Sequence, residues 1–295
     1  MKKSFCAAAG WRVSWREEFD GERLNTSVWN VEQGAGTIRR SNADCRGQSC
    51  IPLGSCRDAY CHHDNVRLSD GQLILTSQRR EFSGRKFTTG AVNTWGKLAF
   101  RGDAAEGAFR MCISARLPGV AGHAAGVWPA HWLMPHDDSC DPDEGEMDVM
   151  EMVDGDGTVY STYHWQDAYP RQPCAYPQGH RHVFAQANLS AGWNATFHEW
   201  AVERGPGHVA FALDGKVLLN ATSDAAFSAD AATGASSRKR TPSPPPKFWD
   251  KAWYLIINTA IGGGWPGPVQ PDTVFPITHA VDYVRVARRA VVVDV

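Results

Sequence analysis

The chain has 295 residues and a mass of 32.4 kDa, which is enough for one large domain. With 43% hydrophobic and 21% charged residues, its composition excludes a disordered protein, and a formal net charge of −2 provides no basic excess for nucleic acid. No segment approaches the ~18 apolar residues of a membrane-spanning helix. Twelve tryptophans beside 28 glycines and 17 prolines are typical of short strands and shaped loops rather than of a helix bundle.

The ends of the chain and one internal stretch differ from the rest. Residues 1–10 begin with basic residues and end with alanines, but their apolar stretch is shorter than the ~7–15 residues of a signal core, so we expect a truncated signal or a cloning remnant. A single domain is expected over 11–289, followed by a short tail at 290–295. The basic, then proline-rich stretch within 230–246 predicts a solvated insertion loop, and the alternative is a contact for an anionic polymer.

Eight cysteines suggest an oxidising compartment. Four of them form a C-x4-C-x5-C-x4-C run from Cys45 to Cys61, which could bind zinc or form disulfides. Sequons of the form Asn-x-Ser/Thr begin at Asn25, Asn188, Asn194 and Asn220. They favour disulfides and a secreted, extracellular glycoprotein, although no complete signal peptide is visible. Cys140 and Cys174 are the best candidates for a further bridge.

Strand patterns recur along the chain. Residues 66–68 and 72–76 alternate around Asp70-Gly71, and residues 208–213 and 216–219 alternate around Asp214-Gly215, so each pair predicts a hairpin. Further strands are expected over 108–117, 253–258 and 281–286. No 3.6-residue apolar stripe exceeds two turns. The sequence therefore predicts an all-β antiparallel sandwich or barrel.

The segment 143–151 concentrates acidic residues. In a regular strand Glu146 and Asp148 share one face and Glu151 lies on the other, because the side chains alternate. One extra residue bulging out near Met150 would bring all three carboxylates to one face. Retaining glycosidases use two carboxyl groups about 5–5.5 Å apart, as nucleophile and acid/base. An acidic edge strand or a calcium cluster is the alternative.

Tryptophans surround this segment in sequence. Trp128 and Trp132 precede it, the Tyr163-His164-Trp165 run follows it, and Trp265 lies among glycines and prolines. Indole rings stack on the apolar faces of sugars, which favours a saccharide ligand. Core packing is the alternative for each tryptophan, and it is favoured for Trp200 and Trp253, which lie inside strand patterns.

With the acidic segment and the tryptophans in this order, the sequence resembles glycoside hydrolase family 16 in its laminarinase-like (endo-β-1,3-glucanase) branch. The resemblance covers nearly the whole chain, and the matching blocks are 15–30, 65–71, 88–97, 128–132, the E-x-D-x-x-E strand 146–151, 197–200, 258–267 and 281–286. It implies a jelly-roll β-sandwich with a concave substrate cleft. The extra residue of E-x-D-x-x-E separates the chain from lichenase-like and xyloglucan-transferase-like members. It leaves laminarinases and the galactanases of algal walls.

The resemblance also assigns roles. Glu146 would be the nucleophile, Glu151 the acid/base and Asp148 the assisting carboxylate of a retaining enzyme that acts on β-1,3-glucan. The expected substrate-binding residues are Trp128, Trp132, His164, Asn65 and Trp265. Family members often carry a structural Ca²⁺, whose ligands here would be backbone oxygens of Glu18 and Gly71 and the side chain of Asp282. No cofactor is expected for catalysis.

Other classes fit the sequence less well. A non-catalytic β-glucan recognition protein of the same fold would lack the catalytic carboxylates, and this chain has both Glu146 and Glu151. A zinc protease is excluded because Val202 stands where the second histidine of His198-Glu199-x-x-His would be. A transglycosylase that uses the same covalent intermediate, or a galactanase, stays open. We expect a monomer whose partner is a polysaccharide and not a nucleic acid.

Overall fold

The computed structural model describes residues 4–36, 55–136, 144–167, 179–223, 247–248 and 250–289. Its elements in chain order are η1 (Phe5–Ala7), β1 (Trp11–Glu17), β2 (Asn30–Val31), β3 (Gly34–Gly36), β4 (Arg57–Cys61), η2 (His63–Asn65), β5 (Val66–Ser69), β6 (Gln72–Ser77), β7 (Thr88–Thr89), β8 (Ala91–Asn93), β9 (Phe100–Arg101), β10 (Phe109–Arg116), β11 (Val127–Pro135), β12 (Glu146–Met152), β13 (Thr158–Gln166), β14 (His180–Asn188), η3 (Trp193–Ala195), β15 (His198–Gly205), β16 (His208–Leu213), β17 (Lys216–Thr222), β18 (Ala252–Ile261) and β19 (Ile277–Arg289). In the described part of the chain, no helix is long and apolar enough to cross a bilayer.

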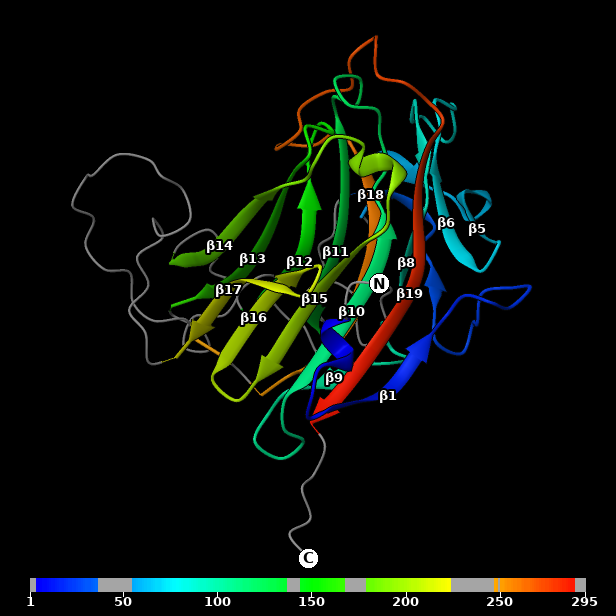
Figure 1. Ribbon diagram of the computed structural model, residues 1–295. Helices are drawn as coiled ribbons and strands as arrows, with labels where there is room; N and C mark the ends of the chain where they lie inside the picture. Colours follow the sequence, from blue (N-terminus) through cyan, green and yellow to red (C-terminus); the bar gives the residue numbers. More distant parts are fainter. Residues whose placement is uncertain are drawn as a thin grey trace, which may run out of the picture.

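Two sheets pack against each other as a jelly-roll β-sandwich (Figure 1). One sheet has the order β17-β16-β15-β10-β19-β6-β5, and β1 pairs with β19 beside that path. The other has the order β14-β13-β12-β11-β18-β4-β3, with β2, β7, β8 and β9 attached to its β4 and β18 region. Among the described strands, all pairings are antiparallel except β4 with β18 and β4 with β7, so the predicted fold class is confirmed.

Both predicted hairpins form around Asp-Gly turns. Ser69 pairs with Gln72 and Leu213 pairs with Lys216, which leaves two residues in each turn. Asp70, Gly71, Asp214 and Gly215 all have φ between 50° and 79°. Positive φ at both turn positions is the geometry that matches the twist of paired strands, and Asp-Gly tolerates it.

The hydrophobic core lies between the two sheets. Inward side chains of β10, β15 and β19 meet those of β11, β12 and β18, and the large aromatic residues Trp200 and Trp253 are fully buried there. Their strand patterns predicted this burial. Trp265, in the loop after β18, keeps 45% of its surface exposed, as its glycine- and proline-rich setting suggested.

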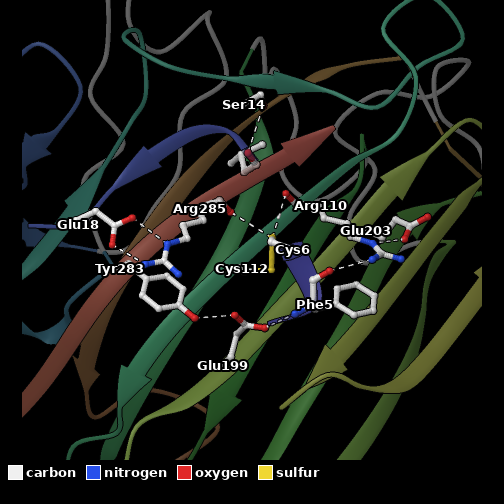
Figure 2. The surroundings of a disulfide bond; sticks show 11 residues. Phe5, Cys6, Ser14, Glu18, Arg110, Cys112, Glu199, Glu203, Tyr283 and Arg285 are labelled. Carbon is white, nitrogen blue, oxygen red and sulfur yellow. Dashed lines mark hydrogen bonds and ion pairs between the residues drawn. A yellow bond between two sulfur atoms is a disulfide. The ribbon is translucent and has the colours of Figure 1, made fainter. Parts of the chain in front are cut away.

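The N-terminal segment packs on the outer face of the eight-stranded sheet (Figure 2). A disulfide joins Cys6 to Cys112 on β10, and both residues are fully buried. The Phe5 amide donates to Glu199, and Arg110 donates to the Phe5 carbonyl and lies 3.8 Å from the centre of its ring. Residues 4–10, expected as a processed or foreign segment, are therefore built into the domain.

A second disulfide joins Cys56 and Cys61, which bracket most of strand β4. It confirms disulfides over zinc for this half of the cysteine run. All four cysteines in the described part of the chain are in disulfides. Cys45, Cys50, Cys140 and Cys174 lie outside the described residues, as do the insertion loop 230–246 and the tail 290–295.

Candidate active site

Strand β12 contains the bulge that the acidic motif predicts. Glu146 and Asp148 pair with His164 and Thr162 on β13, but the next partner pair is Glu151 with Tyr160, so two residues of β12 stand opposite one residue of β13. The pairing of β12 with its other neighbour, β11, shows the same extra residue in β12, because His131 pairs with Met150 and the next residue, Trp132, pairs with Asp148. The phase of the side chains therefore changes by one position between Asp148 and Glu151.

The bulge turns three carboxylates toward one pocket on the outer face of the eleven-stranded sheet. Glu146, Asp148 and Glu151 all line this open pocket. The methionines and valine between them, together with Met152, are fully buried in the core. The pocket is completed by the residues Ser55, Arg57, Trp128, Ala130, Trp132, Asn258 and Ala260.

Glu151 is the most perturbed carboxyl group in the pocket. Only 9% of its surface is exposed, and burial, followed by the negative charge of Asp148, raises its pKa well above the ordinary value for glutamate. Trp128 donates its indole N–H to Glu151 Oε1 at 3.0 Å, and this hydrogen bond and the charge of Arg57 lower the same pKa. A carboxyl whose pKa is raised in this way holds its proton to higher pH than an ordinary glutamate does, which suits a general acid.

Asp148 lies between the two glutamates in the motif and contacts the next strand. Its side chain is 4% exposed, and its Oδ2 lies 2.9 Å from Nε2 of His164 on β13. The other ring nitrogen of His164, Nδ1, is 3.0 Å from Nε2 of His180 on β14. Burial, and then the neighbouring His164, lower the pKa of His180 to about 4.

Aromatic side chains form one wall of the site. Trp128 meets Trp265 edge-on, with ring centres 5.5 Å apart, and Trp265 meets Tyr160 in the same way at 5.2 Å. Trp132 is anchored by a hydrogen bond from its indole N–H to Asn258 Oδ1 at 2.8 Å. Trp128 and Trp132 line the pocket together with the carboxylates, whereas Trp265 lies outside that lining and contacts Trp128 from the loop after β18.

Other expected ligand-binding residues lie elsewhere. Asn65 does not line the pocket, because it is buried with 1% exposure and donates its side-chain amide to the Thr76 carbonyl. Tyr163 and Trp165 alternate with His164 along β13 and therefore point into the core, where their rings stack on each other. Only His164 of that run faces the site.

Arg57 and Asn258 are among the pocket residues that the sequence analysis did not name. Arg57 lies over the Trp128 ring, with its guanidinium carbon 4.9 Å from the ring centre. Asn258 accepts from Trp132 and donates to the Ser55 carbonyl at 2.7 Å. Arg57 thus brings a guanidinium to the pocket from β4.

The residues expected to bind calcium lie along strand β19 of the other sheet and at the ends of the two strands that pair with it. β1 and β6 both pair with β19, β1 as far as Glu17 opposite Val284 and β6 from Leu73 opposite Val281. Glu18 and Gly71 therefore extend from these pairs toward Asp282, the residue that bulges out opposite β10. The Glu18 carboxylate is engaged by Arg285 at 2.7 and 2.8 Å (Figure 2), which does not involve its backbone oxygen.

Comparisons with known proteins agree with this arrangement. Residues 57–233 match the model of the glycosyl hydrolases family 16. This stretch covers more than half of the chain and includes strand β12. The chain belongs to glycosyl hydrolases family 16.

Individual known proteins resemble the chain over nearly its full length. The chain is 28% identical to "Glucan endo-1,3-beta-glucosidase A1" of Niallia circulans over 291 residues, which are 95% of this chain but 38% of that protein. It is 27% identical to a "Beta-glucanase" of Rhodothermus marinus, over 95% of this chain and 86% of that one. The solved catalytic domain of an endo-1,3-beta-glucanase (laminarinase) from Thermotoga petrophila is 25% identical, with a TM-score of 0.70 over 95% of this chain and 98% of the other. Family 16 membership makes the protein a glycoside hydrolase and identifies the carboxylate pocket as its candidate active site.

Proposed function

We propose that this protein hydrolyses internal linkages of a β-1,3-glucan of the laminarin type with net retention of anomeric configuration. The observation that carries the proposal is the bulge in β12, which turns Glu146, Asp148 and Glu151 into one pocket beside Trp128. The activities in the names of the Niallia circulans and Thermotoga petrophila proteins support this substrate class.

In the first step, Glu146 acts as nucleophile. Its carboxylate attacks the anomeric carbon while Glu151 gives its proton to the glycosidic oxygen, so the bond to the leaving sugar breaks as the glycosyl ester forms. Burial and the charge of Asp148 favour the protonated form of Glu151, and the Trp128 N–H fixes the direction of its carboxyl group. Both features serve proton donation at neutral pH.

In the second step, water replaces the leaving sugar. Glu151, now a carboxylate, takes a proton from water, the water oxygen attacks the anomeric carbon, and Glu146 leaves as a carboxylate. Esterification of Glu146 removes one negative charge from the pocket, which lowers the pKa of Glu151 in the intermediate. The lower pKa favours the carboxylate form of Glu151 that this step requires. Asp148, with His164 at 2.9 Å, holds the geometry between the two glutamates.

The aromatic wall provides the sugar platform. Trp128 and Trp132 present apolar ring surface next to the carboxylates, Trp265 extends that surface through its contact with Trp128, and sugar C–H faces stack on such surface. Arg57, Asn258 and Ser55 supply polar groups in the same pocket for the hydroxyls. An apolar platform with a few polar neighbours is the composition that suits a glucan chain.

The test is incubation with laminarin, mixed-linkage glucan, agarose and carrageenan, with products followed by chromatography and by proton NMR. We expect laminarin to give oligosaccharides of mixed length and the first reducing ends to be β-anomers. The Glu146→Gln variant controls for contaminating activity. An α-anomer appearing first would contradict retention, and preferential cleavage of agarose would identify a galactanase.

We infer that the protein is secreted and glycosylated. Buried disulfides support an oxidising compartment. Three sequon asparagines, Asn25, Asn188 and Asn220, are exposed and can accept a glycan, whereas Asn194 donates its side-chain amide to the Gly119 carbonyl at 3.0 Å. Expression in a eukaryotic secretory host followed by peptide mass spectrometry tests this, and we expect glycans on the first three and none on Asn194.

We also propose one structural calcium ion, held by backbone oxygens of Glu18 and Gly71 and by Asp282. The register that brings these three positions to the junction of β1, β6 and β19 supports the site. Oxygen ligands in loose geometry suit Ca²⁺. The ion would tie two strand ends to β19, on the sheet opposite the carboxylate pocket.

A further inference from the structure

We propose that His164, His180 and His182 form a binding site for a transition-metal ion such as Zn²⁺ at the edge of the catalytic pocket. His164 is on β13, and the other two are on β14. Neither the proposed hydrolysis nor the calcium site uses His180 or His182.

Strand register places the three imidazoles on one face. His164 pairs directly with His182, and Glu146 pairs with His164, so a row of three residues crosses β12, β13 and β14 on the pocket side. His180 precedes His182 by two positions on β14 and therefore shares its face. The rings lie against each other, with centres 5.1, 5.7 and 5.8 Å apart.

The ring nitrogens converge closely enough to share an ion. One nitrogen from each histidine can be chosen so that all three lie within 4.8 Å of one another. Nδ1 of His164 and Nε2 of His180 are 3.0 Å apart, near the spacing of two ligands on one zinc ion with Zn–N bonds of about 2.0–2.1 Å. Small rotations of exposed His182 and half-buried His180 would complete the set.

The ligand type selects the class of metal. Three imidazoles suit Zn²⁺, Cu²⁺ or Ni²⁺, whereas Ca²⁺ and Mg²⁺ require oxygen ligands. A three-histidine set leaves a fourth position for water or another ligand, as in open zinc sites. β14 is the last strand in its sheet order in the described part of the chain.

Asp148 gives the site an outer partner. If His164 binds the ion through Nδ1, its Nε2–H is left facing Asp148 Oδ2 at 2.9 Å. A metal-binding histidine usually donates its second ring N–H to a carboxylate or carbonyl in this way. The acidic residue that assists catalysis would thus also orient a metal ligand.

This connection predicts inhibition, a step that rests on the proposed function. An ion bound to His164 places two positive charges on a residue that contacts Asp148 and that pairs across the strands with Glu146. Those charges weaken the attack of the Glu146 carboxylate and fix a ring that lines the approach of the sugar. We therefore expect micromolar Zn²⁺ to lower hydrolysis of laminarin reversibly.

Metal binding is measured directly on the untagged full chain by isothermal titration calorimetry with ZnCl₂, and by electron paramagnetic resonance with Cu²⁺ for nitrogen ligation. We expect one tight site, weakened at least 100-fold in His180→Gln/His182→Gln and at least 10-fold in His182→Gln alone. The exposed position of His182 protects the fold of the single variant. Thermal melts check both variants for folding.

The matched control is His63→Gln, because His62, His63 and Asp64 form another cluster of potential ligands in the described part of the chain. This variant should keep the tight site. Loss of tight binding in His63→Gln with retention in His182→Gln, or no binding in the wild type, would overturn the proposal. Glu146→Gln should bind zinc as the wild type does, so metal binding is decided even if laminarin is not the substrate.

Discussion

The indole N–H of Trp128 on β11 donates to Oε1 of Glu151 on β12, at 3.0 Å. Trp128 itself lies under the guanidinium of Arg57. Three neighbours therefore act on the pKa of Glu151. Asp148 raises it, whereas Trp128 and Arg57 lower it. Burial is the largest influence and decides the net direction, which is upward.

The pH profile of hydrolysis should move in opposite directions in two variants. Above the pKa of Glu151 the proton donor is lost, so this group sets the alkaline limb of kcat/KM. Asp148→Asn removes a negative charge and should shift that limb to lower pH, whereas Arg57→Gln removes a positive charge and should shift it to higher pH. The exposed Arg67→Gln on β5 is the control. Shifts of the same sign would contradict this account of Glu151.

The roles of the two glutamates can be separated chemically. Glu146→Gln and Glu151→Gln should each lower kcat by several orders of magnitude. Azide should rescue Glu151→Ala on an aryl glycoside with a good leaving group and give a β-glycosyl azide, because the first step then needs no acid and the second needs no base. An α-azide formed by Glu146→Ala is the expected counterpart. A β-azide from Glu146→Ala would reverse the two roles.

The local parts of the fold and site could be predicted from sequence. Asp-Gly between alternating segments specifies a two-residue turn, and the spacing of Glu146, Asp148 and Glu151 required an extra residue for the three to share a face. Both inferences depend on neighbours within a few positions, where side-chain periodicity is decisive.

What depends on distant pairing could not be predicted. Arg57 reaches the pocket because β4 runs beside Ile261 of β18, and no pattern in either segment specifies that partner. The Cys6–Cys112 bridge spans 106 positions, and cysteine spacing does not determine connectivity. Asn65 matched a cleft position by resemblance, yet its amide is used inside the domain by the Thr76 carbonyl.

The two disulfides should differ in their effects. Cys6–Cys112 closes a loop of 106 positions and Cys56–Cys61 one of 5, so loop-closure entropy gives upper values of about 5 and about 2 kcal/mol. Cys6→Ala/Cys112→Ala should lower Tm strongly with little change in KM. Cys56→Ala/Cys61→Ala should lower Tm less but raise KM, because the residues on either side of Cys56 in the chain, Ser55 and Arg57, line the pocket. Calorimetry and laminarin kinetics provide the comparison, and equal effects of the two pairs on KM would contradict it.

A buried histidine pair should make the fold sensitive to acid. His131 on β11 and His279 on β19 are fully buried, with Nε2 atoms 2.9 Å apart. Burial lowers the pKa of His279 to about 3, and burial followed by the charge of His279 holds that of His131 well below its usual value.

Between the lowered pKa values of these two histidines and the ordinary histidine value of about 6.5, the unfolded chain binds more protons than the folded one. The free energy of unfolding therefore falls as pH drops below about 6.5. For His279 the free energy of unfolding should fall by about 2 kcal/mol between pH 7 and pH 5, and His131 should add to this fall. Urea unfolding at several pH values in this range gives the slope of the unfolding free energy against pH. In His279→Gln this slope should correspond to about one proton fewer than in the wild type. The exposed His123→Gln should leave the slope unchanged, and an equal reduction there would exclude the buried pair as the cause.

Calcium should raise the melting temperature without changing the chemistry. An ion that binds only the folded state stabilises it by mass action, and the proposed ligands join the end of β1 and the start of β6 to β19, on the sheet opposite the pocket. Chelation should therefore lower Tm while KM for laminarin stays constant at assay temperature. Asp282→Ala should have the lower Tm already and show no response to calcium. Asp282 also accepts a hydrogen bond from Ser114 at 3.3 Å, so Ser114→Ala is the control for that contact and should keep the calcium response. An Asp282→Ala protein that melts like the wild type, with and without calcium, would leave Asp282 as an ordinary polar residue of β19.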